Sequence, residues 1–125
     1  MAEKVDRRVR KTKAQLRAGL ARLMQKKSIK EITVKELVEE VDINRSTFYL
    51  HYTDIYQMLE SIEAELMDEV SHLVEDYPLD PLNNKESSYP FIEQIFTILD
   101  NNKDICIALL GKNGDMAFVL SLIHI

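Results

Sequence analysis

Residues 32–52, ITVKELVEEVDINRSTFYLHY, are the stretch around which the rest of the chain is arranged. Their order of apolar and polar side chains predicts two short helices joined by a tight turn. Thr33 and Glu36 have the spacing of a capping box, in which the threonine hydroxyl accepts a hydrogen bond from the Glu36 N–H and the Glu36 carboxylate reaches back. Ile32 and Leu37 are placed as a hydrophobic staple across the start of the first helix. The stretch therefore predicts a capped helix followed at once by a second one.

The turn between the two helices is expected at Asp42, because aspartate tolerates a left-handed backbone conformation better than most residues. Asn44 is a good N-cap for the second helix, which we expect to run to about His51. Ile43 and Phe48 would face inward in this helix. The residues left on its outer face are Asn44, Arg45, Ser46, Thr47 and Tyr49.

This outer face suits the major groove of DNA. A guanidinium can bind guanine through two hydrogen bonds, an amide can bind adenine in the same way, and hydroxyls can bind bases or phosphates. An ordinary solvated helix is the alternative interpretation. The capped helix and the turn in front of it favour groove reading, because together they make a helix-turn-helix.

A third helix is predicted before this pair. Thr12 and Gln15 form another capping box, and the apolar residues that follow recur with a helical period, so this helix would brace the other two. Gly19 is a poor helix residue that could allow two helices to pack closely. The predicted buried stripe is Leu16, Leu20, Leu23 and Met24.

Residues 1–11 are polar and basic and form the expected N-terminal arm. They are either a frayed, solvated end or an arm that lies along phosphates or reaches a minor groove. Residues 1–30 hold eleven Lys or Arg against two acidic residues, a net of +9, whereas residues 61–125 hold three against twelve, a net of −9. The asymmetry indicates that the first part meets a polyanion and the second does not.

The rest of the chain also predicts helices, so we expect an all-α fold. Apolar residues keep a helical period from about residue 54 to residue 76, and a loop at residues 77–84 follows. Further helices are expected from Pro90 to about Asp100, from Lys103 to Leu110 with Gly111 as its C-cap, and from Met116 onward. The acidic residues of the long helix are interpreted as a solvated face; they are Glu60, Glu63, Glu65, Asp68 and Glu69.

No catalytic or cofactor motif is found. The three histidines and Cys106 have no metal-ligand spacing, and there is no nucleophile-elbow, phosphate-loop or dinucleotide-binding pattern. Cys106 is interpreted as a small buried side chain rather than a nucleophile. One cysteine, no apolar leader and no membrane-length apolar run favour a cytoplasmic protein. The missing motifs favour a protein that is not an enzyme and needs no cofactor.

The run Thr47-Phe48-Tyr49-Leu50-His51-Tyr52, together with Ile32-Thr33-Val34, resembles the DNA-binding domain of the TetR/AcrR family of transcriptional regulators. The resemblance implies a three-helix helix-turn-helix domain at residues 12–54, then a long linking helix and a helical regulatory and dimerisation domain at 55–125. We expect that second domain to be incomplete. Two residues depart from the family pattern: Asp42 stands in place of a turn glycine, and Ile55 in place of a phosphate-binding lysine.

The same resemblance implies a repressor that binds a palindromic operator in double-stranded DNA as a homodimer. A small-molecule effector of the C-terminal domain is a further implied partner. The alternative is a protein-binding coregulator that keeps the fold without specific DNA readout. The residues expected to contact DNA are Thr33, Lys35, Asn44, Arg45, Ser46, Thr47, Tyr49 and His51.

Overall fold

Every regular element is helical in the part of the chain that the computed structural model describes, residues 2–76 and 88–123. The expectation of an all-α fold is therefore confirmed. The expected loop at residues 77–84 lies outside the described residues. The elements are α1 (Ala2–Met24), the 3-10 turn η1 (Ile29–Glu31), α2 (Val34–Val41), α3 (Arg45–Tyr49), α4 (Ile55–Asp76), α5 (Ser88–Asn101), α6 (Lys103–Leu110) and α7 (Met116–Ile123).

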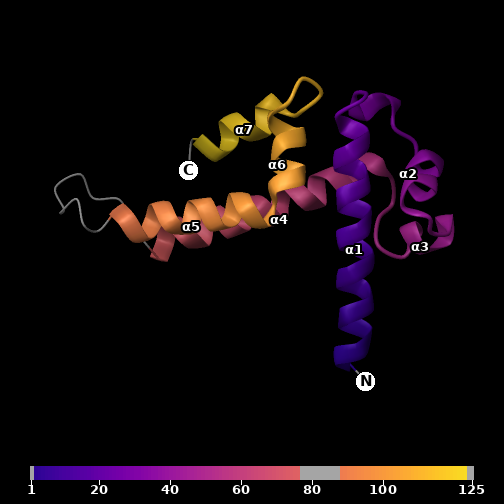
Figure 1. The fold of residues 1–125 in the computed structure, drawn as a ribbon, viewed down its shortest axis with the longest axis horizontal. Coiled ribbons are helices and arrows are strands. Elements are labelled where there is room, and N and C mark those ends of the chain that lie inside the picture. The colour runs from indigo at the N-terminus through magenta and orange to yellow at the C-terminus, as the bar shows by residue number, and fades with distance from the viewer. Residues whose placement is uncertain (1, 77–87, 124–125) are drawn as a thin grey trace.

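Helix α1 lies at the centre of the arrangement (Figure 1). The short helices α2 and α3 lie on one side of it, and α6 packs against it from the other. Helix α5 runs alongside α4, and α7 contacts both α4 and α6. Because α1 touches α2 and α6 at once, it is the element through which the two parts of the molecule are joined.

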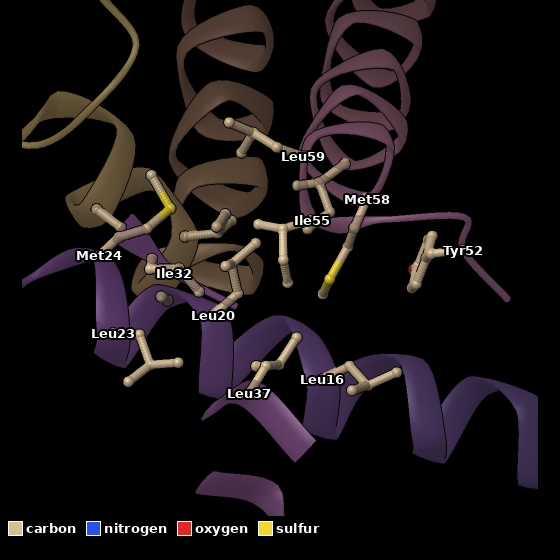
Figure 2. Packing of buried hydrophobic residues seen from close by; sticks show 14 of the residues in the cluster. Leu16, Leu20, Leu23, Met24, Ile32, Leu37, Tyr52, Ile55, Met58 and Leu59 are labelled. Carbon is tan, nitrogen blue, oxygen red and sulfur yellow. The ribbon is translucent and has the colours of Figure 1, made fainter. Parts of the chain in front are cut away.

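One apolar core continues across both parts. Leu16, Leu20 and Leu37 have no exposed surface, and they meet Met58 and Ile62 of α4 in the same cluster (Figure 2). The predicted inward stripe of α1 is thus confirmed. Buried residues from the later helices complete the cluster; they are Leu66, Ile105, Ala108, Leu109 and Phe118.

The start of α1 was predicted wrongly. The helix already includes Ala2, so Thr12 lies inside it and does not cap its first turn. The reason is local: residues 2–11 contain no Gly or Pro and are rich in residues that form helices well, so nothing ends the helix before Thr12. The basic segment is therefore a helical extension of α1 and not an extended arm.

Glu63 was also interpreted wrongly as part of a solvated acidic face. It is half-buried, and its Oε2 atom has no hydrogen-bond partner among the described residues. Burial, reinforced by the neighbouring Asp115 carboxylate, raises the pKa of Glu63 to about 8. At neutral pH this carboxyl is consequently protonated for most of the time.

The apolar side of α5 is largely uncovered in the structure. Ile92, Phe96 and Leu99 are 45%, 65% and 42% exposed, although they follow a helical period typical of a buried face. Further exposed apolar side chains lie on α6 and α7; they are Ile107, Leu110, Met116, Leu120 and Ile123. The described helices therefore leave a large apolar surface on the side of α5, α6 and α7.

Candidate nucleic-acid interface

The helix-turn-helix forms as the local sequence predicts. The Glu36 N–H donates to the Thr33 hydroxyl at 3.1 Å, and Ile32 and Leu37 are both buried, as a staple requires. The reciprocal half of the capping box is replaced: the Glu36 carboxylate forms an ion pair with Lys27 instead. The hydrogen bond with Lys27 is the main reason that the pKa of Glu36 is lowered. The start of α2 is thus fixed both by its own cap and by the connection that precedes it.

Asp42 ends α2 in the left-handed conformation, with φ 58° and ψ 52°. It is the one residue other than glycine with a positive φ in the described chain. The Ile43 N–H closes the turn by donating to the Val38 carbonyl at 3.0 Å. This sharp reversal aims α3 away from α2, so the prediction of a left-handed residue at Asp42 is confirmed.

Helix α3 is shorter than expected. It ends at Tyr49, and its last turn tightens so that Leu50, His51 and Tyr52 donate to carbonyls three or four residues back. Asn44 occupies the N-cap position, but its side chain makes no capping bond; its carbonyl accepts from the Thr47 N–H at 3.0 Å. The Asn44 amide is consequently left available for a ligand outside the chain.

Phe48 decides which side of α3 faces outward. Its ring has no exposed surface and makes an edge contact with Tyr49, with ring centroids 5.4 Å apart. It also packs on Tyr52 at 5.7 Å. Ile43 packs partly buried against the same core. With these side chains inward, Asn44, Arg45, Ser46 and Tyr49 are exposed and Thr47 is partly exposed.

The remaining predicted contact residues lie at the edges of the hairpin, the name used here for the helix pair α2–α3. Thr33 and Lys35 are exposed at the start of α2. His51 is half-buried, with its ring centroid 6.3 Å from that of Tyr52. All eight residues expected to contact DNA thus lie at least partly exposed on or directly beside α2 and α3. The structure holds no DNA, so their contacts remain predictions.

An ion pair and a close approach hold α2 against α1. Arg22 donates to Glu40 at 3.1 Å. Gly19 faces the end of α2, where an added Cβ would overlap the Cγ1 of Val41 and lie 3.2 Å from the Cδ1 of Leu37. The expectation that Gly19 allows close packing is therefore confirmed. Since exposed ion pairs contribute little, the steric fit at Gly19 is the stronger determinant of the angle between α1 and α2.

The basic extension of α1 is a candidate part of the interface, and sequence reasoning missed that it is helical. Arg8, Lys11, Gly19 and Arg22 follow one another with helical spacing, so they share one face of α1. Gly19 and Arg22 contact α2 on that face. The exposed cations Arg8 and Lys11 therefore continue toward the N-terminus on the side of the α2–α3 pair. The absence of any helix breaker in residues 2–11 is the signal that could have revealed this.

The start of α4 departs from the family pattern in a defined way. Ile55 is 4% exposed and belongs to the core, so it cannot contact a phosphate. Asp54 caps the helix by accepting from the Gln57 N–H at 2.8 Å. Tyr56 is 52% exposed directly after it. Position 55 therefore offers no cation, and the exposed side chain that follows it is a tyrosine.

The segments before and after α6 are joined to α1 and α4 by amide side chains. Asn113 donates to the Met24 carbonyl at 3.0 Å, which fixes the α6–α7 connection to the end of α1. Asn102 is 8% exposed and donates to the Glu69 carboxylate at 3.3 Å. Cys106 is half-buried, and burial raises the pKa of its thiol. The described residues contain no metal-binding cluster and no helix long and apolar enough to cross a membrane.

Comparison with known proteins agrees with this geometry. Residues 16–62 match the family model "Bacterial regulatory proteins, tetR family", a range that runs from α1 through the hairpin into α4. A stretch of 55 residues is 29% identical to a Bacillus subtilis (strain 168) protein described as an uncharacterized HTH-type transcriptional regulator, YxbF. That stretch is 44% of this chain and 14% of the relative. No solved structure matches the chain. The helix-turn-helix domain of this chain therefore matches that of the tetR family of bacterial regulatory proteins.

Proposed function

We propose that the protein represses transcription by binding a palindromic DNA operator as a homodimer, with α3 in the major groove. The observation that carries the proposal is the burial of Phe48, which turns the polar side chains of α3 outward beyond the reversal at Asp42. A helix presented in this way places its N-terminal residues at base edges. Arg45 and Asn44 lie in that N-terminal turn and have the donors that read guanine and adenine.

The basic face of α1 supports binding to the DNA backbone. Arg8 and Lys11 lie on the side of the hairpin, and cations flanking a recognition helix neutralise phosphates without reading sequence. Acidic residues dominate the later helices, so the attraction is confined to the N-terminal part. Because the proposed target is DNA, we also propose that the protein is located in the cytoplasm.

Dimerisation through the later helices is the second part of the proposal. A palindrome needs two recognition helices about 34–36 Å apart, or a multiple of that spacing, and a rigid connection between them. The uncovered apolar surface of α5, α6 and α7 is of the kind that associates in water. Phe96→Glu, at its most exposed aromatic, should shift sedimentation equilibrium toward monomer and weaken operator binding, while Glu93→Gln on the same helix should do neither. Unchanged dimers in Phe96→Glu would count against this surface.

An effector would act through α1. This helix contacts α2 on one side and α6 on the other, so a ligand that shifts α6 relative to α1 would alter the orientation of the hairpin. An effector that binds among α4, α5, α6 and α7 is therefore part of the proposed function. If the affinity for the operator were the same with and without each ligand that the protein binds, the effector would no longer be part of the proposal.

Operator selection from random duplexes, followed by anisotropy at several salt concentrations, tests DNA reading. Arg45→Ala should weaken binding to the selected site by about 1–3 kcal/mol and relax preference at one base pair. Lys112→Ala removes an exposed cation of the α6–α7 connection, outside the α2–α3 pair, and should leave affinity unchanged. A steep loss of affinity with salt is expected, because bound cations leave the phosphates.

Tyr49→Phe removes one hydroxyl and keeps the ring that packs on Phe48, so the fold should survive. If the hydroxyl contacts a phosphate, affinity should fall equally on the selected site and on random DNA. A chain that selects no sequence from the pool and shows no salt-dependent binding would refute the proposal. That result would instead favour a protein-binding coregulator.

A further inference from the structure

A cleft of about 710 Å³ lies between α1, α4 and the connection from α5 to α6, with Tyr52 at the end of the helix-turn-helix also in its lining. Its α1 wall carries three cations at helical spacing: Arg10, Lys13 and Arg17. The opposite wall is formed by residues 100–105. The volume lies in the range of pockets that hold small organic molecules. No part of the proposed DNA interface uses this cleft.

Arg17 is the unusual group in this cleft. Its Nη1 atom lies 3.6 Å from the Glu65 carboxylate, which is a weak, partly exposed contact. Its Nε and Nη2 atoms are shielded from solvent and have no hydrogen-bond partner among the described residues. Donors of a charged group that are shielded from water and left without a partner are costly to the fold. The structure therefore holds an arginine with one half paired and the other half unsatisfied.

The two unsatisfied atoms form one edge of the guanidinium. The Nε and Nη2 hydrogens point in parallel, and this edge matches the two oxygens of a carboxylate or a phosphate group. Arg17 lines the cleft, but this edge is shielded in the present conformation, so binding requires the flexible side chain to rotate and present the edge to the cavity. Lys13 adds a second cation beside it, with Nζ 5.9 Å from the Tyr52 ring centroid.

The rest of the lining indicates what the ligand looks like beyond its anionic group. Val9, Ala14 and Ile62 give the middle of the cleft an apolar surface. Asp100 and Asp104 lie on the wall opposite the cations together with Lys103, so this wall favours a ligand end that is neutral or carries hydrogen-bond donors over a second anionic group. A purely inorganic anion would leave the apolar middle unfilled.

We infer that this cleft binds a small organic anion, whose carboxylate or phosphate is held by Arg17 and whose apolar body lies between α1 and α4. The two headgroups share the chemistry that Arg17 recognises, so both are tested. The inference goes beyond the proposed function, because binding here can be measured without DNA.

Titration of the full chain, labelled with ¹⁵N, with benzoate and with phenyl phosphate tests the inference by NMR. At least one probe should give saturable shifts at the Arg17 Nε–H and at backbone amides of residues 13–18 and 100–105. A larger effect of benzoate or of phenyl phosphate identifies the preferred headgroup. Benzamide is the neutral match of benzoate and should give no saturable shift at these residues.

Variants separate the role of Arg17 from a general effect of charge. Arg17→Lys keeps the charge and loses the two-donor edge, so binding should weaken by about tenfold. Arg17→Gln should abolish saturable shifts. Arg22→Gln removes an arginine from the same helix outside the cleft and should bind as the wild type does. The amide spectrum of each variant reports whether it is folded. If Arg17→Gln does not fold, Arg17→Lys still tests the role of the two-donor edge.

Two results would overturn the inference. One is the absence of saturable shifts at Arg17 with both anions, which would leave water as the partner of its free edge. The other is binding that benzamide reproduces or that Arg17→Lys retains at full strength. Loss of DNA binding in the experiments on Arg45 would leave this inference untouched.

Discussion

Substitution of Gly19 by alanine tests the close approach between α1 and α2. The added methyl would overlap Val41 Cγ1 and press on Leu37, so the helices must separate or the side chains must shift. Overpacking of this kind costs about 1–3 kcal/mol. Alanine is up to about 1 kcal/mol better than glycine inside a helix, which offsets part of the cost. We expect a net loss of about 1 kcal/mol, or roughly 3–6 °C in Tm for a chain of this size.

Urea unfolding followed by circular dichroism measures this change, and a double-mutant cycle identifies its cause. Val41→Ala alone should cost about 1 kcal/mol of buried apolar surface. In the double variant the new methyl takes the space that Val41 vacates, so the combined loss should be smaller than the sum of the two. Ala14→Gly, at an exposed site of the same helix, calibrates the helix-propensity part.

A Gly19→Ala protein at least as stable as the wild type, with an additive cycle, would refute the reasoning. It would mean that Val41 moves aside freely and that Gly19 does not set the distance between the helices. The angle of the helix-turn-helix on α1 would then depend on the buried leucines alone.

Three further predictions concern caps, the turn and pH. Asp42→Gly should leave the Tm unchanged or raise it, because glycine takes the left-handed conformation without strain; a clear drop would show that the carboxylate itself is needed. Thr33→Ala should lower the free energy of unfolding by about 1 kcal/mol, and Thr33→Ser should restore it. Equal stability of the two variants would show that the Thr33 cap does not stabilise α2. The folded pKa of Glu63, about 8, lies above the ordinary 4.5, so folding takes up a proton between these values and the free energy of unfolding should fall as pH rises across that window. Glu63→Gln should flatten this fall and stabilise the protein at pH 8 and above by on the order of 1 kcal/mol, a small effect because the group is half-exposed and screened. Glu75→Gln, at an exposed position, is the control. Parallel plots of stability against pH for the wild type and Glu63→Gln would contradict the raised pKa of Glu63.

Much of the helix-turn-helix follows from neighbours in the sequence. The cap at Thr33, the staple of Ile32 and Leu37, and the left-handed turn at Asp42 each depend on residues within five positions. Such short-range interactions are the same in the isolated chain and in the fold, so a pattern of residue types is enough to predict them. The inward position of Phe48 follows from the helical period in the same way.

Capping patterns nevertheless allow a helix to start without requiring it. Thr12 and Gln15 have the right spacing, yet α1 passes through them because the residues before them also favour a helix. A start is fixed only where something in front of the cap prevents a longer helix. The connection before Thr33 does this and the basic segment does not.

The environments of single side chains depended on parts of the chain that lie far apart in the sequence. Glu63 has the sequence context of a solvated acidic face, but burial in the fold, reinforced by Asp115 fifty-two positions later, raises its pKa to about 8. Arg17 has the context of an ordinary surface arginine, and packing near α4 and α6 shields its donors. Burial and charge at such positions are sums over neighbours brought together by the fold, and no local pattern contains them. The sequence was therefore sufficient to predict the capped helix pair α2–α3, whereas the cleft beside α1 and the exposed face of α5 depend on how the helices pack.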